Sequence, residues 1–127
     1  MPEKKKILVV DDEEEYRVLM CRVLAAAGYE VRSAANGRDG LKLYAESVPD
    51  LVMLDVMLPD MLGFDFCRTI RAGAEAPETP VLFCSVRFAV SSLARGIREG
   101  STDYVIKPFV PEDLLARVRA ALAGKKA

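Results

Sequence analysis

Two stretches of the sequence decide the fold: Ile7-Leu8-Val9-Val10-Asp11-Asp12 and Leu51-Val52-Met53-Leu54-Asp55. In each stretch, four apolar residues run directly into an acid. An apolar run without alternation indicates a parallel strand that is covered by helices on both faces of its sheet. Three further short runs, at residues 30–33, 81–84 and 104–106, bring the number of predicted strands to five.

The gaps between the predicted strands are each long enough for one helix. Apolar residues recur at helical spacing in two segments, namely Tyr16, Leu19, Met20, Val23 and Leu24, and Leu114, Leu115, Val118 and Leu122. Pro111 suits the first turn of the last helix, and Gly124 ends it. Gly28 is typical of a helix C-terminus, whereas Asn36-Gly37 and residues 59–63 are typical of turns. Strands that alternate with helices predict an α/β fold, a (βα)5 doubly wound sheet of five parallel strands.

The composition predicts one soluble domain with no direct affinity for nucleic acid or membrane. A chain of 127 residues that is 51% hydrophobic and 29% charged is expected to fold as a single domain over residues 1–127, with an ordered core from about 5 to 123. Eighteen Lys and Arg against nineteen Asp and Glu leave a net charge of −1, too little to recruit nucleic acid or an anionic membrane. The N-terminus shows no apolar run of signal-peptide or spanning length, so we expect a cytoplasmic protein.

Histidine is absent and cysteine is sparse. Without histidine, the chain lacks the commonest general base and the side chain that normally becomes a phosphohistidine. Cys21, Cys67 and Cys84 are odd in number and far apart, which predicts reduced thiols that pack as small apolar side chains. A zinc site is therefore excluded in practice, and any phosphoryl donor must come from elsewhere.

Polar side chains follow the predicted strands at the ends where a ligand crevice is expected. Asp11 and Asp12 follow the first strand, Asp55 the third, Ser85 the fourth and Lys107 the fifth. In a sheet of order 2-1-3-4-5, the first and third strands are neighbours about 4.8 Å apart, so their three carboxylates would share one pocket. Two like charges about 5 Å apart repel by roughly 3 kcal/mol at an effective dielectric constant near 20. Because one lysine leaves a deficit of two charges, we expect a divalent cation, and Mg²⁺ suits such a site best.

Most of these residues also have an ordinary structural explanation. Asp12 could cap the following helix, Lys107 could be a surface lysine, and Ser85 could bond to backbone at a strand end. Asp55 resists such an explanation, because no helix obviously starts after it and a carboxylate at a buried edge calls for a function. The joint occurrence of all these residues favours chemistry over capping.

The sequence resembles the receiver domains of two-component response regulators, from Lys6 to about Ala123. The segments that carry the resemblance are 9–13, 50–61, 63–64, 85 and 100–109. The resemblance implies the flavodoxin-like receiver fold with strand order 2-1-3-4-5. It also implies a signalling switch that catalyses its own phosphorylation and dephosphorylation and is not a turnover enzyme.

The resemblance further implies a role for each acid of the predicted cluster. Asp55 is expected to be the phosphoacceptor, which takes a phosphoryl group from the phosphohistidine of a sensor histidine kinase or a phosphotransfer protein. Mg²⁺ would be held by Asp11, Asp12 and Asp55 together with the backbone carbonyl of Met57. These ligands would place the cation beside the phosphoryl group.

The same resemblance implies how the phosphoryl group is sensed. Lys107 would contact the phosphoryl oxygens, and the hydroxyl of Ser85 would reorient toward the same group. Tyr104 would then swing inward as the output lever. The Lys107-Pro108 peptide bond is expected to be cis.

Some positions depart from the family pattern. Val86 stands where the family usually has a small residue, and its branched side chain is expected to slow access to the acyl phosphate. Ser91, Ser92 and Glu99 weaken the prediction of a homodimer through the fourth helix, fifth strand and fifth helix, whereas residues 113–119 of the fifth helix support it. The chain is either a stand-alone receiver or part of a longer regulator with an output domain, and the sequence leaves both open.

Two other functions compete with the switch. A pseudo-receiver adaptor would bind partners without phosphorylation, but every acid, hydroxyl and lysine position is filled. A flavin carrier or an aspartyl-nucleophile phosphatase would use a similar fold. The acids at residues 11–15 would repel a flavin phosphate, and Met57 stands where the phosphatase needs its second acid.

Overall fold

Strands and helices alternate along the computed structural model, which describes residues 4–73, 78–85 and 103–124. The elements are β1 (Lys6–Val10), α1 (Glu14–Ala26), β2 (Glu30–Ala34), α2 (Gly37–Glu46), β3 (Leu51–Leu54), α3 (Gly63–Ala72), β4 (Val81–Ser85), β5 (Asp103–Ile106) and α5 (Pro111–Leu122). The expected fourth helix falls at residues 86–102, outside the described residues. None of the helices within the described ranges is long and apolar enough to cross a membrane.

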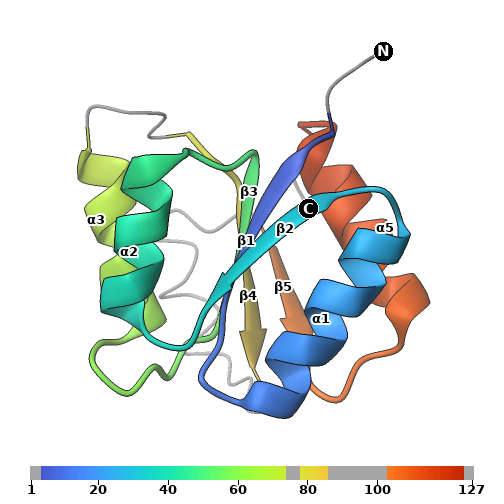
Figure 1. Cartoon of the computed structure of the whole chain (residues 1–127), viewed down its shortest axis with the longest axis horizontal. Coiled ribbons are helices and arrows are strands. Elements are labelled where there is room, and N and C mark those ends of the chain that lie inside the picture. Colours follow the sequence, from blue (N-terminus) through green and yellow to red (C-terminus); the bar gives the residue numbers. More distant parts are fainter. Residues whose placement is uncertain (1–3, 74–77, 86–102, 125–127) are drawn as a thin grey trace.

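The five strands form one parallel sheet in the order β2-β1-β3-β4-β5. The predicted α/β fold and strand order are therefore confirmed. Val10 at the end of β1 pairs with Leu54 at the end of β3, and Ser85 at the end of β4 pairs with Ile106 at the end of β5. Because paired strands end level with each other, the residues that follow them lie along a single edge of the sheet (Figure 1).

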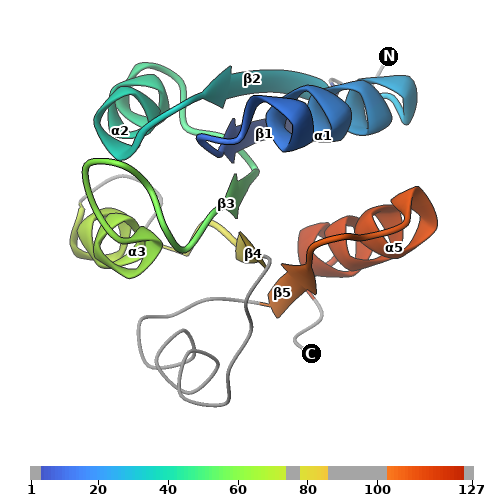
Figure 2. The same cartoon turned by 90° about the horizontal axis from the view of Figure 1, so that it is seen from below.

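Helices cover both faces of the sheet, α1 and α5 on one face and α2 and α3 on the other (Figure 2). Alternate residues of β1 accordingly enter two different cores, with Ile7 and Val9 on the α1 and α5 side and Leu8 and Val10 on the α2 and α3 side. All four residues of β3 are buried. Burial of both faces explains why these strands lack an apolar and polar alternation.

One local expectation holds and one fails at the helix ends. Gly28 follows α1 with a φ of +99°, a left-handed conformation that favours glycine. Asn36 and Gly37 start α2 instead of forming a separate turn, because the Asn36 side chain caps the helix by accepting a bond from the backbone N of Asp39 at 2.7 Å. The apolar residues at helical spacing from Tyr16 to Leu24 all lie in α1, as expected, although Leu19 is 39% exposed.

Candidate functional site

The sheet brings Asp11 and Asp55 together at its carboxyl edge. The backbone N of Asp55 donates to the carbonyl of Val10 at 3.0 Å, and the backbone N of Asp11 donates to the carbonyl of Ala34 at 3.1 Å. Each acid is thus held by a strand next to its own. One carboxylate oxygen from each of Asp11, Asp12 and Asp55 lies within 4.8 Å of the others. The three carboxylates that the sequence placed at one edge therefore form one cluster.

The three acids of this cluster differ in burial and in partners. Asp11 is fully buried, Asp55 is 5% exposed, and Asp12 is exposed. Asp11 Oδ1 accepts a bond from the backbone N of Glu13 at 2.9 Å. The N-cap residue of α1 is Glu13, so the alternative explanation of Asp12 as a helix cap does not apply.

Lys107 lies in the middle of the acids, with its side chain fully buried. Its Nζ lies 2.7 Å from Asp11 Oδ2, 2.8 Å from Glu13 Oε1 and 3.3 Å from Asp55 Oδ2. The ring centroid of Tyr16 lies 4.5 Å from the same nitrogen. Burial alone would lower the pKa of Lys107, but the ion pair with Asp11, the bond to Glu13 and the charge of Asp55 raise this pKa above its ordinary value, so the ammonium stays charged.

The backbone around Lys107 links it to β4. Its N–H donates to the carbonyl of Ser85 at 2.8 Å, and the Lys107-Pro108 peptide bond is cis. Ser85 is the last residue of β4 and is 8% exposed. The candidate hydroxyl residue and the candidate lysine are therefore direct neighbours at the sheet edge.

The carboxyl group of Asp55 has a pKa raised to about 6 from the ordinary 3.8. Burial is the main cause, the charge of Lys107 opposes it, and the charge of Asp11 adds to it. The backbone N of Met57 also donates to Asp55 Oδ1 at 3.2 Å, which favours the ionised form. Asp55 is thus an ionised carboxylate at neutral pH that is poorly solvated and open to stabilisation by a cation.

The donor set fits a hard divalent cation. Asp11 Oδ2 is buried and, although close to Lys107, accepts no well-aligned hydrogen bond within the described part of the chain. Carboxylate and carbonyl oxygens are the ligands that Mg²⁺ prefers, and the cluster offers three carboxylates with a single buried lysine among them. Met57 lies beside this cluster through its bond to Asp55, while its side chain points outward and is 65% exposed.

The segment between Asp55 and α3 is fixed by contacts that the sequence did not reveal. A Cβ on Gly63 would lie 2.3 Å from the carbonyl oxygen of Asp55, so only glycine allows this approach. Asp60 reaches across to α2, where its two carboxylate oxygens accept bonds of 2.8 Å from the backbone N–H groups of Gly37 and Arg38. These bonds, that of Gly37 foremost, lower the pKa of Asp60. The loop that follows Asp55 is therefore tied to the start of α2.

The remaining predicted residues lie away from the acid cluster or outside the described ranges. Tyr104 is half-buried in β5, with the guanidinium carbon of Arg117 5.8 Å from its ring centroid. Val86 and the fourth-helix positions Ser91, Ser92 and Glu99 lie outside the described residues. Glu13 is a site residue that sequence reasoning missed, since nothing in its position next to Asp12 signals a contact with Lys107.

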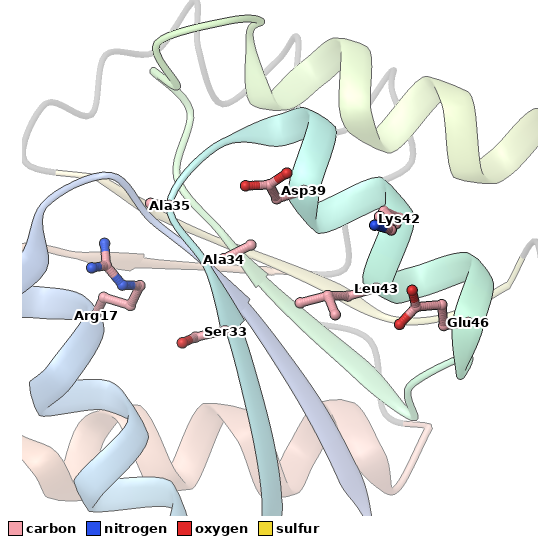
Figure 3. Close-up of a pocket in the computed structure, with 8 residues that line it drawn as sticks. All are labelled: Arg17, Ser33, Ala34, Ala35, Asp39, Lys42, Leu43 and Glu46. Carbon is pink, nitrogen blue, oxygen red and sulfur yellow. The ribbon is translucent and has the colours of Figure 1, made fainter.

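A separate cavity of about 470 Å³ opens between α1, the end of β2 and α2 (Figure 3). Arg17 lines it from α1, and Asp39, Lys42 and Glu46 line it from α2. Two bases and two acids give this lining no net charge that would select an anion or a cation. Arg17 also donates to the backbone carbonyl of Asp11 at 2.9 Å, so one of its roles is to hold the strand end that carries the cluster.

Comparison with known proteins agrees with this arrangement. The family model of the response regulator receiver domain matches residues 7–119. The response regulator MprA of Mycolicibacterium vanbaalenii is 43% identical over 117 residues, which are 92% of this chain and 50% of that protein. The phosphate regulon transcriptional regulatory protein PhoB of Rhizobium meliloti is 40% identical over 121 residues, 95% of this chain and 53% of that protein. The chain thus spans about half the length of these curated relatives.

Two solved structures match this chain over nearly the full length of both chains. Chemotaxis protein CheY4 of Vibrio cholerae superposes with a TM-score of 0.89 and 33% identity, covering 92% of this chain and 98% of that one. A CheY-like response regulator receiver domain protein of Methanospirillum hungatei superposes with a TM-score of 0.89 and 27% identity, covering 96% of each. Fold and sequence similarity agree, and the chain belongs to the receiver domains of response regulators in two-component signal transduction.

Proposed function

We propose that Asp55 accepts a phosphoryl group and that the domain is a switch controlled by this modification. The observation that carries the proposal is the buried Asp55 carboxylate, with Lys107 Nζ 3.3 Å from one of its oxygens and two further aspartates within 4.8 Å. A structural role explains this cluster poorly, since concentrated buried charge destabilises a fold unless it is compensated. A site that receives a phosphoryl group needs a nucleophile, a fixed cation and ligands for a metal, and all are present.

The proposed reaction needs only chemistry that these residues supply. A carboxylate oxygen of Asp55 attacks the phosphorus of a phosphohistidine. The N–P bond breaks, its electron pair stays on the imidazole nitrogen, and an acyl phosphate O–P bond forms. With a pKa of about 6, Asp55 is mostly ionised at neutral pH and can act as the nucleophile. Lys107 neutralises charge on the transferred oxygens, and later attack by water returns the free carboxylate.

Asp11, Asp12 and Asp55, with the backbone carbonyl of Met57, would hold Mg²⁺ in this proposal. When bound, the cation supplies charge neutralisation on the phosphoryl oxygens. Asp12 suits this role because its carboxylate is exposed and lies within 4.8 Å of those of Asp11 and Asp55. Receiver domains generally use Mg²⁺, and the oxygen donors here match that ion.

Phosphorylation replaces a single carboxylate charge with about two charges and new acceptor oxygens. We infer that the Ser85 hydroxyl and the Lys107 ammonium meet these oxygens, and that Tyr104 moves with the β4 end and serves as the output lever. A difference of a few kcal/mol in contacts between the two forms is enough to invert their populations. The output would then be a change in the surface that includes β5.

The proposed partners follow from the chemistry. The donor is a sensor histidine kinase or a phosphotransfer protein, because the chain has no histidine of its own. Residues 1–127 would act as one cytoplasmic domain with a core from about 5 to 123, which signals to an output domain or a downstream protein. The curated relatives include transcriptional regulators, so control of transcription is the output we propose for a longer regulator. A homodimer would use β5, α5 and the fourth-helix segment.

Incubation with acetyl phosphate and Mg²⁺, followed by intact-mass measurement, tests the proposal. We expect the wild-type protein to gain one phosphate and Asp55→Asn to gain none. Asp50→Asn is the matched control, since Asp50 precedes the same strand at its opposite end and is exposed. If the wild-type protein gains no phosphate, even from a cognate kinase, the pseudo-receiver adaptor is correct instead.

A further inference from the structure

Lys107 has more anionic partners than the proposed reaction needs. Of its three carboxylates, Asp11 and Asp55 belong to the proposed metal and phosphoryl site. The third, Glu13, lies 2.8 Å from Nζ, closer than Asp55 at 3.3 Å. Three carboxylate oxygens lie within 3.3 Å of the ammonium nitrogen and the Tyr16 ring centroid lies 4.5 Å from it, so these described residues already crowd the cation that a phosphoryl oxygen would approach.

Glu13 differs from the other two partners in its freedom to leave. The side chains of Asp11 and Asp55 are 0% and 7% exposed, whereas that of Glu13 is 46% exposed. Its backbone is held by the bond from its N–H to Asp11, and its side chain makes no capping bond to α1. The carboxylate can therefore rotate into solvent without disturbing the strand end or the helix.

We propose that Glu13 occupies, in the unphosphorylated domain, the place on Lys107 that the phosphoryl group takes over. The proposal rests on the phosphoacceptor role of Asp55 given above. A phosphoryl group brings about two negative charges to Lys107, and one carboxylate must then withdraw. Asp11 is buried and Asp55 carries the group, so Glu13 is the partner that is displaced. Glu13 is thus a positioning residue that opposes phosphorylation both by holding the ammonium and by repelling the incoming charge.

The test compares Glu13→Gln with Glu14→Gln, which removes the same charge from the adjacent exposed residue in the first turn of α1. Affinity for the phosphoryl mimic beryllofluoride is measured at saturating Mg²⁺, and affinity for Mg²⁺ alone is measured by calorimetry. Rates of phosphorylation by acetyl phosphate are followed by intact mass. In Glu13→Gln, we expect beryllofluoride to bind about threefold to tenfold more tightly and phosphorylation to accelerate by a similar factor.

The Glu14→Gln control separates the contact of Glu13 with Lys107 from the general effect of removing one negative charge. Glu14→Gln should change both quantities by less than about twofold. The Mg²⁺ affinities show whether the metal site is saturated in each variant, so that a change in metal binding is not mistaken for a change at Lys107. Equal beryllofluoride affinities in the two variants, or weaker binding by Glu13→Gln, would overturn the role of Glu13 while leaving Asp55 as the phosphoacceptor. Absence of both phosphate and beryllofluoride binding in all proteins would overturn the two proposals together.

Discussion

Strand β3 has an aspartate at each end, and the two have opposite surroundings. Asp50 precedes the strand, is exposed, and accepts a bond of 2.7 Å from the backbone N of Lys6. Asp55 follows the strand, is buried, and faces the Lys107 ammonium and the charge of Asp11. The first acid ties β3 to β1 at one edge of the sheet. The second is placed where its own charge is disfavoured.

The two acids therefore differ in their effect on stability: Asp50 stabilises the fold through its bond, whereas the buried charge of Asp55 destabilises it. At the amino edge of the sheet, water can solvate any charge that loses its partner. At the carboxyl edge, Asp11, Asp55 and Lys107 are nearly inaccessible to water, so each depends on the others. Substitutions at the two edges should therefore have very different effects on the free energy of unfolding.

Removal of the buried cation should have the largest effect. Lys107→Met leaves Asp11 and Asp55 without a counter-ion, and we expect a loss of about 3–5 kcal/mol in the free energy of unfolding at neutral pH. Urea unfolding without Mg²⁺ measures this loss of free energy. Lys6→Met is the control, because the backbone of Lys6 holds Asp50 and its Nζ contacts only Ser47 Oγ, at 3.4 Å, among the described residues. A similar loss in both variants would show that the edges do not differ.

Neutralisation of the buried acceptor should have the opposite sign. We expect Asp55→Asn to stabilise the metal-free protein by about 1–3 kcal/mol above pH 7, because the raised pKa of Asp55 means that its ionised form destabilises the fold. The gain should shrink as the pH falls through about 6 toward 3.8, where the native carboxyl of the wild-type protein is already protonated. Asp50→Asn removes the same charge at the exposed end of β3, and it should not stabilise the protein in parallel urea unfolding at pH 7. A gain for Asp55→Asn that is independent of pH would contradict this cause.

Mg²⁺ should stabilise the carboxyl edge by a smaller amount. At a concentration about ten times its dissociation constant, the ion should add about 1.4 kcal/mol to the free energy of unfolding of the wild-type protein. Thermal melts with and without Mg²⁺ measure this shift. Asp12→Asn should remove most of it with little change in the metal-free melt, since Asp12 is exposed. Asp50→Asn should keep the full shift, and a loss there would place the ion elsewhere.

The sequence predicted the sheet and the cluster for a common physical reason. Apolar runs that end abruptly in a polar residue mark both a buried strand and its carboxyl end, so the placement of Asp11, Asp55, Ser85 and Lys107 on one edge followed once the strand order was assumed. Asn36-Gly37 was assigned wrongly because asparagine suits both a turn and an N-cap, and local sequence does not decide between them.

The contacts that sequence could not predict depend on side-chain direction across large separations. Glu13 and Lys107 are 94 residues apart, and Asp60 caps a helix that begins 23 residues earlier. Neither contact repeats with a period, and neither residue type is unusual at its position. Such contacts can be identified only once the backbone positions are known. In this domain, they position the Lys107 side chain and the loop after Asp55.

Substitution of Arg117, beside the edge strand β5, should change the free energy of unfolding least, and the effect of salt on this change tests the contrast with Lys107. Arg117 of α5 lies 3.1 Å from Asp103 and 3.3 Å from Asp113, and its side chain is 37% exposed. Burial would lower its pKa, but these two acids raise it. Arg117→Gln should cost about 0.5–1 kcal/mol, with Arg119→Gln as a nearly neutral control on the same helix. In 1 M salt, exposed charges are screened beyond about 3 Å, so the cost at Arg117 should largely disappear. The cost of Lys107→Met should persist, because salt screens buried charge pairs much less than exposed ones. Equal salt sensitivity at the two positions would mean that Lys107 is far more hydrated than its burial indicates.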